Sequence, residues 1–226
     1  MKEAVRLLAS LDPETYGVIF LSLRVTCIAL IAAAAFGIPA GVALGLASFP
    51  GKAVLMNIVN AFMSLPPVVA GLAVYILLSN QTGLVGDHRL LFTTTAMCIA
   101  QFVLAFPLMT GLSTAAVTQV DRQILLTAKS LGARPFQAAS AVVREARYGI
   151  YSAFIVIFGR LIAEVGAVMM VGGNIRYQTR VMTTAIALHK GMGEFQTALA
   201  LGIILLILSF CVNALLELLR NIGKTG

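Results

Sequence analysis

Five long apolar stretches constrain most strongly what this chain can fold into. A helix needs about 20 apolar residues to cross a bilayer core about 30 Å thick. The stretches that reach this length are residues 17–47, 56–79, 92–117, 148–171 and 197–219. Two spans would need about 40 residues, so the first stretch is expected to be one tilted or overhanging helix. The sequence predicts an all-α membrane protein with about five transmembrane helices, in a single domain over residues 1–226.

Composition excludes most other classes of protein. Hydrophobic residues make up 59% of the chain and charged residues 11%, whereas soluble domains average about 45–50% and about 25%. This balance of hydrophobic and charged residues excludes a soluble enzyme, a nucleic-acid-binding module and a disordered chain. Cys27, Cys98 and Cys211 lie inside apolar stretches without metal-ligand spacing, and His88 and His189 are far apart, so no metal site is expected.

The basic residues outside the stretches indicate the orientation. With the N-terminus outside, eight lysines and arginines lie in inner segments and six in outer ones. Five of the inner ones fall in residues 119–147, and short cytoplasmic loops carry an excess of such residues. The sequence predicts an outer N-terminus, a cytoplasmic C-terminus and a cytoplasmic segment 119–147. The N-terminal segment, with apolar Val5, Leu8 and Leu11, is either a short helix on the membrane surface or a frayed end.

Residues 119–147 contain signals for two helices. Asp121 is placed to cap a helix over residues 122–131, which Gly132 ends by adopting a left-handed conformation. Pro135 then fits the first turn of a second helix, which ends near residue 147. The result is a compact cytoplasmic knob. It either transmits force to a soluble partner or is a surface hairpin that only covers the bundle.

Residues 127–133, TAKSLGA, resemble the cytoplasmic signature of binding-protein-dependent ABC importer permeases. That signature reads Glu-Ala-Ala, two residues, Leu-Gly; here Leu126 and Thr127 replace the Glu and the first Ala, and Arg144-Glu145 replace a Leu-Pro that often follows. The resemblance implies a type I importer fold whose coupling helix docks into a cleft on a separate ATPase subunit. The residues to which it assigns this contact are Thr127, Ala128, Leu131, Gly132 and Ala133.

Further motifs are similar to the tungstate and molybdate branch of these permeases, and most similar to the tungstate-specific members. They are Ser22-Leu23-Arg24, Phe49-Pro50-Gly51-Lys52, Leu65-Pro66-Pro67-Val68-Val69-Ala70-Gly71, Phe106-Pro107-Leu108-Met109, and the run from Ala163 to Asn174 with Thr179 to Ile186 after it. The implied function is tungstate import by a non-catalytic membrane subunit. A molybdate or sulfate importer is an alternative, and a stand-alone membrane enzyme or channel is a remote one.

The same resemblance implies the partners and the location. ATP and Mg²⁺ would bind to the partner ATPase, so this chain is expected to hold no cofactor. An extracytoplasmic oxyanion-binding protein would deliver the substrate, and a second copy of the chain would complete the path. The expected location is the cytoplasmic (inner) membrane of a prokaryote, in contact with lipid and not with nucleic acid.

Two groups of residues within the apolar stretches have expected roles. Gly37, Gly41 and Gly45 recur every four residues, which predicts close approach of another helix. Arg160 and Glu164 stand four apart, where they can pair on one helix face. Charges at membrane depth are costly and favour the interior or a pore. The pair is therefore either part of a gate on the substrate path or a neutralised contact between helices; the role of Arg24 stays open.

The outer segment 172–196 carries Arg176, Arg180 and Lys190. Its basic residues could steer an oxyanion inward, and the segment could receive a loaded binding protein. A solvated loop near the lipid headgroups is the other interpretation, and the sequence does not separate the two.

Overall fold

The computed structural model describes residues 13–79 and 90–222, and each regular element in these ranges is a helix. The expectations for Val5, Leu8, Leu11 and His88 concern residues outside the described ranges. The helices, in chain order, are α2 (Pro13–Leu46), α3 (Lys52–Met63), α4 (Pro67–Leu78), α5 (Thr94–Thr118), α6 (Arg122–Ser130), α7 (Pro135–Ile162), α8 (Gly166–Gly172), α9 (Met182–Gly191) and α10 (Phe195–Ile222).

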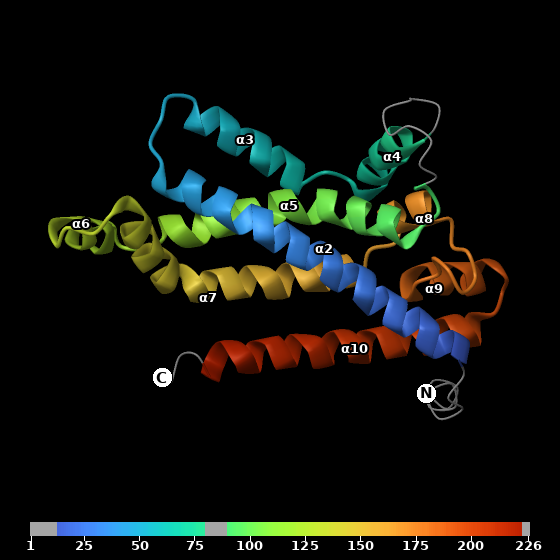
Figure 1. Cartoon of the computed structure of the whole chain (residues 1–226). Helices are drawn as coiled ribbons and strands as arrows, with labels where there is room; N and C mark the ends of the chain where they lie inside the picture. The colour runs from blue at the N-terminus through green and yellow to red at the C-terminus, as the bar shows by residue number, and fades with distance from the viewer. Residues whose placement is uncertain (1–12, 80–89, 223–226) are drawn as a thin grey trace.

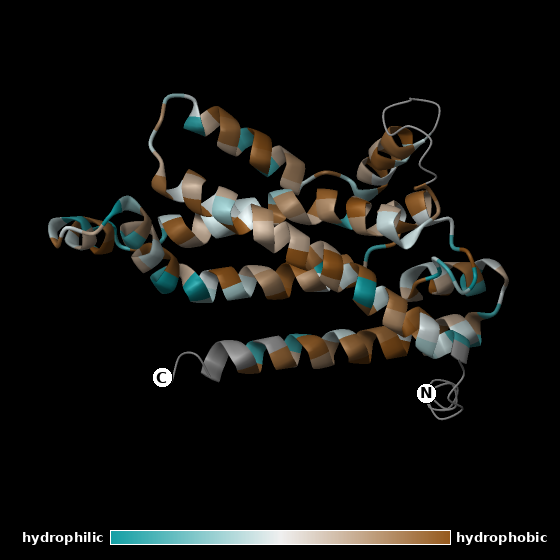
Figure 2. Cartoon of the chain, in the orientation of Figure 1, coloured by the Kyte–Doolittle hydropathy of each residue, from teal (hydrophilic) through white to brown (hydrophobic). Residues whose placement is uncertain are grey.

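The long helices α2, α5, α7 and α10 run along the length of the molecule, with α6 at one end and α9 at the other (Figure 1). The start of α2 and the end of α10 lie at opposite ends. Apolar residues cover the long helices, and hydrophilic residues gather around α6 and near α9 (Figure 2). Glu14–Leu46, Thr94–Thr118 and Phe195–Leu215 are each long and apolar enough to cross a membrane.

Bent helix pairs occupy the second and fourth of the predicted stretches. The axes of α3 and α4 differ by 97°, and those of α7 and α8 by 56°. Pro66 and Pro67 account for the first break, since proline lacks the N–H that a helix needs and disfavours helical backbone in the residue before it. If each bent pair is one span, five segments have the length and composition to cross a membrane.

α7 is longer than the sequence predicts. A short helix ending near residue 147 and a separate span over 148–171 were expected, but one helix runs from Pro135 to Ile162. Its buried residues Val142, Ala146 and Ile150 follow one another at intervals of four, and the stripe continues through Ala153 and Ile157. Because one face stays buried throughout, the arginines on the other face do not interrupt the helix.

α2 and α5 pack more extensively against each other than other helix pairs do. A Cβ on Gly37 would lie 2.8 Å from the Cβ of Met109, and one on Gly45 would lie 2.6 Å from Cγ1 of Val117. A Cβ on Gly41 would lie 2.6 Å from the backbone oxygen of Thr110. Every one of these distances is too short for a real side chain, so the three glycines lie where the two helices are closest.

Candidate functional site

The knob formed by α6 and the first turns of α7 projects from one end of the bundle (Figure 1). The backbone N–H of Gln123 donates a hydrogen bond to Oδ1 of Asp121 at 2.8 Å. This cap satisfies one of the donors that the start of a helix leaves unpaired. The predicted cap at Asp121 and the predicted helix start at Pro135 are both confirmed.

α6 ends in a Schellman motif that residues of the TAKSLGA segment build. The N–H of Ala133 donates to the carbonyl of Ala128, and the N–H of Gly132 donates to that of Lys129, each at 3.0 Å. Gly132 has a φ of 79°, a left-handed conformation that glycine adopts without steric cost. The spacing of Ala128, Gly132 and Ala133 therefore produces the sharp turn between α6 and α7.

Large apolar side chains on both sides of this turn face outward. Leu131 is 83% exposed and Phe136 is 84% exposed. Thr127 is exposed as well, whereas Ala128 and Ala133 are half-buried. α6 itself packs against α7, so these side chains stand on a supported surface. Two large apolar side chains are therefore exposed beside the turn between α6 and α7.

The predicted ion pair between Arg160 and Glu164 is wrong. α7 ends at Ile162, so the two residues do not share a helix face, and within the described residues no salt bridge joins them. Arg160 is exposed. Oε1 of Glu164 instead accepts a hydrogen bond from the backbone N–H of Ala167 at 3.1 Å. Glu164 therefore caps the start of α8, where the helix dipole favours a negative charge.

α4 and α8, the helices that follow the two sharp bends, pack against each other. A Cβ on Gly166 would lie 2.7 Å from Cγ2 of Val68, and a Cβ on Gly71 would lie 2.7 Å from the Cα of Ala167. Neither glycine leaves room for a side chain, so α4 and α8 touch almost backbone to backbone. The two helices therefore form one closely packed unit.

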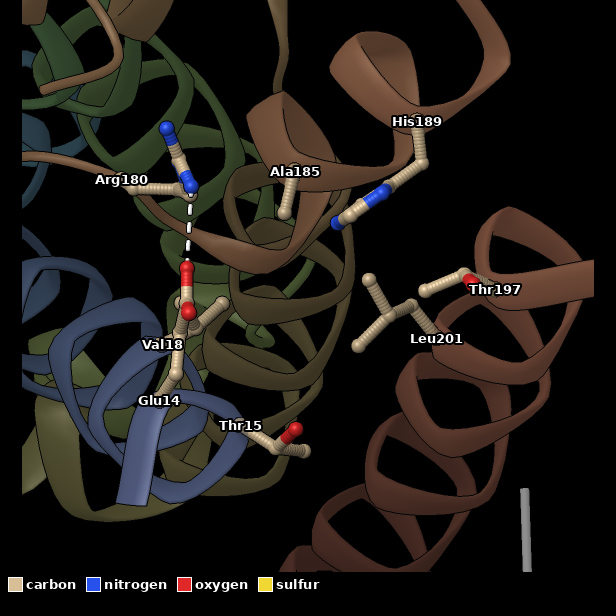
Figure 3. Close-up of a pocket in the computed structure, with 8 residues that line it drawn as sticks. All are labelled: Glu14, Thr15, Val18, Arg180, Ala185, His189, Thr197 and Leu201. Atoms are coloured by element: carbon tan, nitrogen blue, oxygen red, sulfur yellow. Dashed lines mark hydrogen bonds and ion pairs between the residues drawn. The ribbon is translucent and has the colours of Figure 1, made fainter. Parts of the chain in front are cut away.

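Glu14 joins α2 to the turn before α9, at the end of the molecule opposite the knob. Its carboxylate accepts hydrogen bonds from Nε of Arg176 at 3.0 Å and from Nη1 of Arg180 at 3.0 Å; Figure 3 shows the contact with Arg180. Glu14 is 162 positions from Arg176 and 166 from Arg180. No local pattern links residues so far apart, so the sequence did not predict this cluster.

The predicted site residues lie in three separate places: the glycines between α2 and α5, Arg160 and Glu164 at the α7–α8 break, and the coupling residues on the knob. No group of three or more His, Cys, Asp or Glu residues in the described part of the chain is arranged to hold a metal. Cys27, Cys98 and Cys211 are free thiols. Nδ1 of His189 lies 2.7 Å from Oε2 of Glu194, in an exposed pair.

Comparisons with known proteins agree with this architecture. The tungstate uptake system permease protein of Peptoclostridium acidaminophilum is 42% identical over 97% of this chain and 96% of its own length. The molybdenum transport system permease protein of Escherichia coli (strain K12) is 30% identical, over 94% and 96% of the two chains.

A chain in a structure of the MetNI methionine ABC transporter in inward-facing conformations superimposes with a TM-score of 0.73. The match covers 93% of this chain and 97% of that one, at 18% sequence identity, and shows that the fold is that of a type I ABC importer permease. The family model for the binding-protein-dependent transport system inner membrane component matches residues 37–221. The chain belongs to the family of binding-protein-dependent transport system inner membrane components.

Proposed function

We propose that this chain is the transmembrane permease subunit of a binding-protein-dependent ABC transporter that imports tungstate. The observation that carries the proposal is the higher identity to the tungstate permease than to the molybdenum permease, over nearly the full length of all three chains. This difference in identity, 42% against 30%, favours tungstate over molybdate as the substrate.

The knob is the proposed docking surface for the ATPase subunit, which would bind ATP and Mg²⁺. Leu131 and Phe136 supply the apolar contact area, and the left-handed turn at Gly132 holds them on either side of the bend. α7 then runs without interruption from the knob to the break at Ala163. A push on the knob would therefore move α8 and, through the close contact with Gly71, α4.

The α7–α8 break is the proposed gate region. Glu164 fixes the start of α8 through its hydrogen bond to Ala167, and Thr183 Oγ1 donates to the carbonyl of Glu164 at 2.8 Å. Arg160 lies in the last turn of α7, with its side chain exposed. A second copy of the chain would complete the substrate path. Arg160 and Glu164, at the end of α7, would then line that path.

An extracytoplasmic oxyanion-binding protein would dock at the end opposite the knob, where Arg176 and Arg180 lie. This assignment places the start of α2 outside and the knob in the cytoplasm of a prokaryotic cell, with the chain in the inner membrane. The basic residues of the knob support it, because positive charge accumulates on cytoplasmic segments.

Cellular tungsten and molybdenum, measured by elemental mass spectrometry at trace concentrations of both, test the proposal. Deletion of the gene should lower tungsten alone, and restoration should recover it. Loss of molybdenum instead would keep the mechanism and reject tungstate as the substrate. No change in either element, in a strain without redundant importers, would reject oxyanion import altogether.

A further inference from the structure

A cavity of about 260 Å³, lined by both charged and apolar residues, lies at the end of the molecule opposite the knob. It is bounded by the first three turns of α2, the start of α5 and the turn before α9. This space is many times the roughly 15 Å³ that one water needs. Its polar lining residues are Glu14, Arg24, Thr94, Tyr177, Gln178 and Arg180.

Positive charge exceeds negative charge around this cavity. Glu14, its acidic lining residue, already accepts hydrogen bonds from both Arg176 and Arg180. Arg24 also lines the cavity, ten residues further along α2; its side chain is exposed, and within the described residues it makes no hydrogen bond or ion pair. A cation within an apolar helix is costly without a counter-ion. Arg24 therefore adds one positive charge to the cavity lining that no described acidic residue compensates.

Arg180 retains donor capacity as well. Its side chain is only 14% exposed, and Nη1 is engaged by Glu14. Its Nε is buried and has no acceptor. Buried N–H groups are rarely left without a partner, since an unpaired donor loses its hydration. Within the described residues, the guanidinium of Arg180 therefore keeps one donor without an acceptor.

The turn that carries Arg180 is built to hold its shape. The carbonyl of Ile175 accepts hydrogen bonds from the N–H groups of Gln178, Thr179 and Arg180. Asn174 and Tyr177 have φ values of 54° and 63°, in the left-handed region that residues with a side chain seldom adopt. Strained backbone of this kind persists where the surroundings fix it, and it is common at ligand sites.

We propose that this cavity binds one tetrahedral oxyanion between Arg24 and Arg180. A guanidinium presents several N–H donors to an oxyanion in a fixed fork, and Thr94 and Gln178 add neutral donors at the rim. The oxygens of a free dianion or of a lipid phosphate provide the same chemistry. Under the proposed function, the free ion is tungstate. Only this identification of the ion rests on the proposed function; the binding site itself does not.

Direct binding to the full chain tests the site in the absence of any binding protein. The chain is placed in nanodiscs of phosphatidylcholine, and bound tungsten is measured after equilibrium dialysis against sodium tungstate. We expect saturable binding that Arg24→Gln weakens at least about tenfold, the size typical for a lost charged hydrogen bond, and that Arg24→Lys partly restores. Lys190→Gln is the matched control, since it removes one exposed positive charge at the same end but outside the cavity.

A second set of nanodiscs contains phosphatidylglycerol, and the lipid retained by the purified chain is quantified. Enrichment of this lipid that depends on Arg24, without tungstate binding, would assign the site to a lipid phosphate. Absence of both signals in wild type, or equal signals in Arg24→Gln, would overturn the proposal, provided that thermal unfolding shows the variant to be folded. If the gene restores tungsten uptake while purified protein binds no oxyanion, the site is wrong and the proposed function stands.

Discussion

Gly132 combines a left-handed backbone with open space around it. Its φ is 79°, and a Cβ there would meet nothing within 4 Å. A substitution therefore acts through backbone strain and not through a clash. Since a left-handed conformation costs an ordinary residue about 1–2 kcal/mol, we expect Gly132→Val to reduce the ATPase subunit that co-purifies with the permease and to reduce tungsten uptake. Asparagine visits this conformation more readily, so Gly132→Asn should retain most of both.

The matched control for this prediction is Gly191→Val. Gly191 also has free space around it, but its φ does not lie in the left-handed region. Equal loss of co-purified ATPase in Gly132→Val and Gly191→Val would contradict a specific role for the turn.

Glu164 offers a second prediction, because the hydrogen bond by which it caps α8 needs an acceptor oxygen, which glutamine also supplies. Glu164→Gln keeps the acceptor for the N–H of Ala167, whereas Glu164→Leu removes it. We expect Glu164→Leu to lower the free energy of unfolding by about 0.5–2 kcal/mol, as lost caps do, and Glu164→Gln to change it little. Thermal unfolding measures this difference. Reduced tungsten uptake by the stable Glu164→Gln variant would support the gate, and unchanged uptake would leave only the capping role.

The observed helix boundaries agree with the predicted ones where the sequence signal is local. Asp121, Gly132 and Pro135 act within one turn of the chain, and all three delimit helices as predicted. The break at Ala163 was missed, because the residues around it lack a proline and Glu164 is also compatible with a helix. Its capping hydrogen bond to Ala167 exists only once the chain bends there. Tertiary contacts, not propensity, determine this break.

The α2–α5 contact gives a prediction at the scale of the element. A Cβ on Gly41 would lie 2.6 Å from a backbone oxygen of Thr110, and Thr114 Oγ1 donates to the carbonyl of Gly41 at 3.1 Å. The backbone of Thr110 cannot rotate out of the way as a side chain can. The added methyl group in Gly41→Ala must therefore push α2 and α5 apart. We expect it to destabilise the protein by about 1–3 kcal/mol, as overpacking does, and to lower the Tm of the purified protein.

Gly17→Ala is the control within the same helix, since a Cβ on Gly17 would meet nothing within 4 Å. Its Tm should stay near that of the wild type. A similar decrease in both variants would show that the glycines matter through backbone freedom and not through helix packing.

At the scale of the whole molecule, the two ends differ in what the sequence could predict. The knob is formed by residues close together in the chain, so its motif and its turn could be predicted. The opposite end joins Glu14 to Arg176 and Arg180 across more than half the chain. The sequence placed these arginines in one outer segment but offered no reason to connect them with Glu14 or Arg24. Such distant pairings depend on the packing of the entire bundle.

The last prediction concerns membrane orientation, which places the knob and the α9 end on opposite sides of the membrane. The proposed function requires the knob inside and the α9 end outside. In a variant with Cys27, Cys98 and Cys211 replaced by serine, Thr127→Cys and Lys190→Cys each introduce one exposed thiol, on the knob and at the end of α9. In intact cells whose outer barrier is permeabilised, a membrane-impermeant maleimide should label Lys190→Cys, whereas Thr127→Cys should react only after the inner membrane is opened. The reverse pattern would place the docking surface outside, where no ATP-driven subunit could reach it, and would reject the coupling proposal even if tungsten uptake were intact.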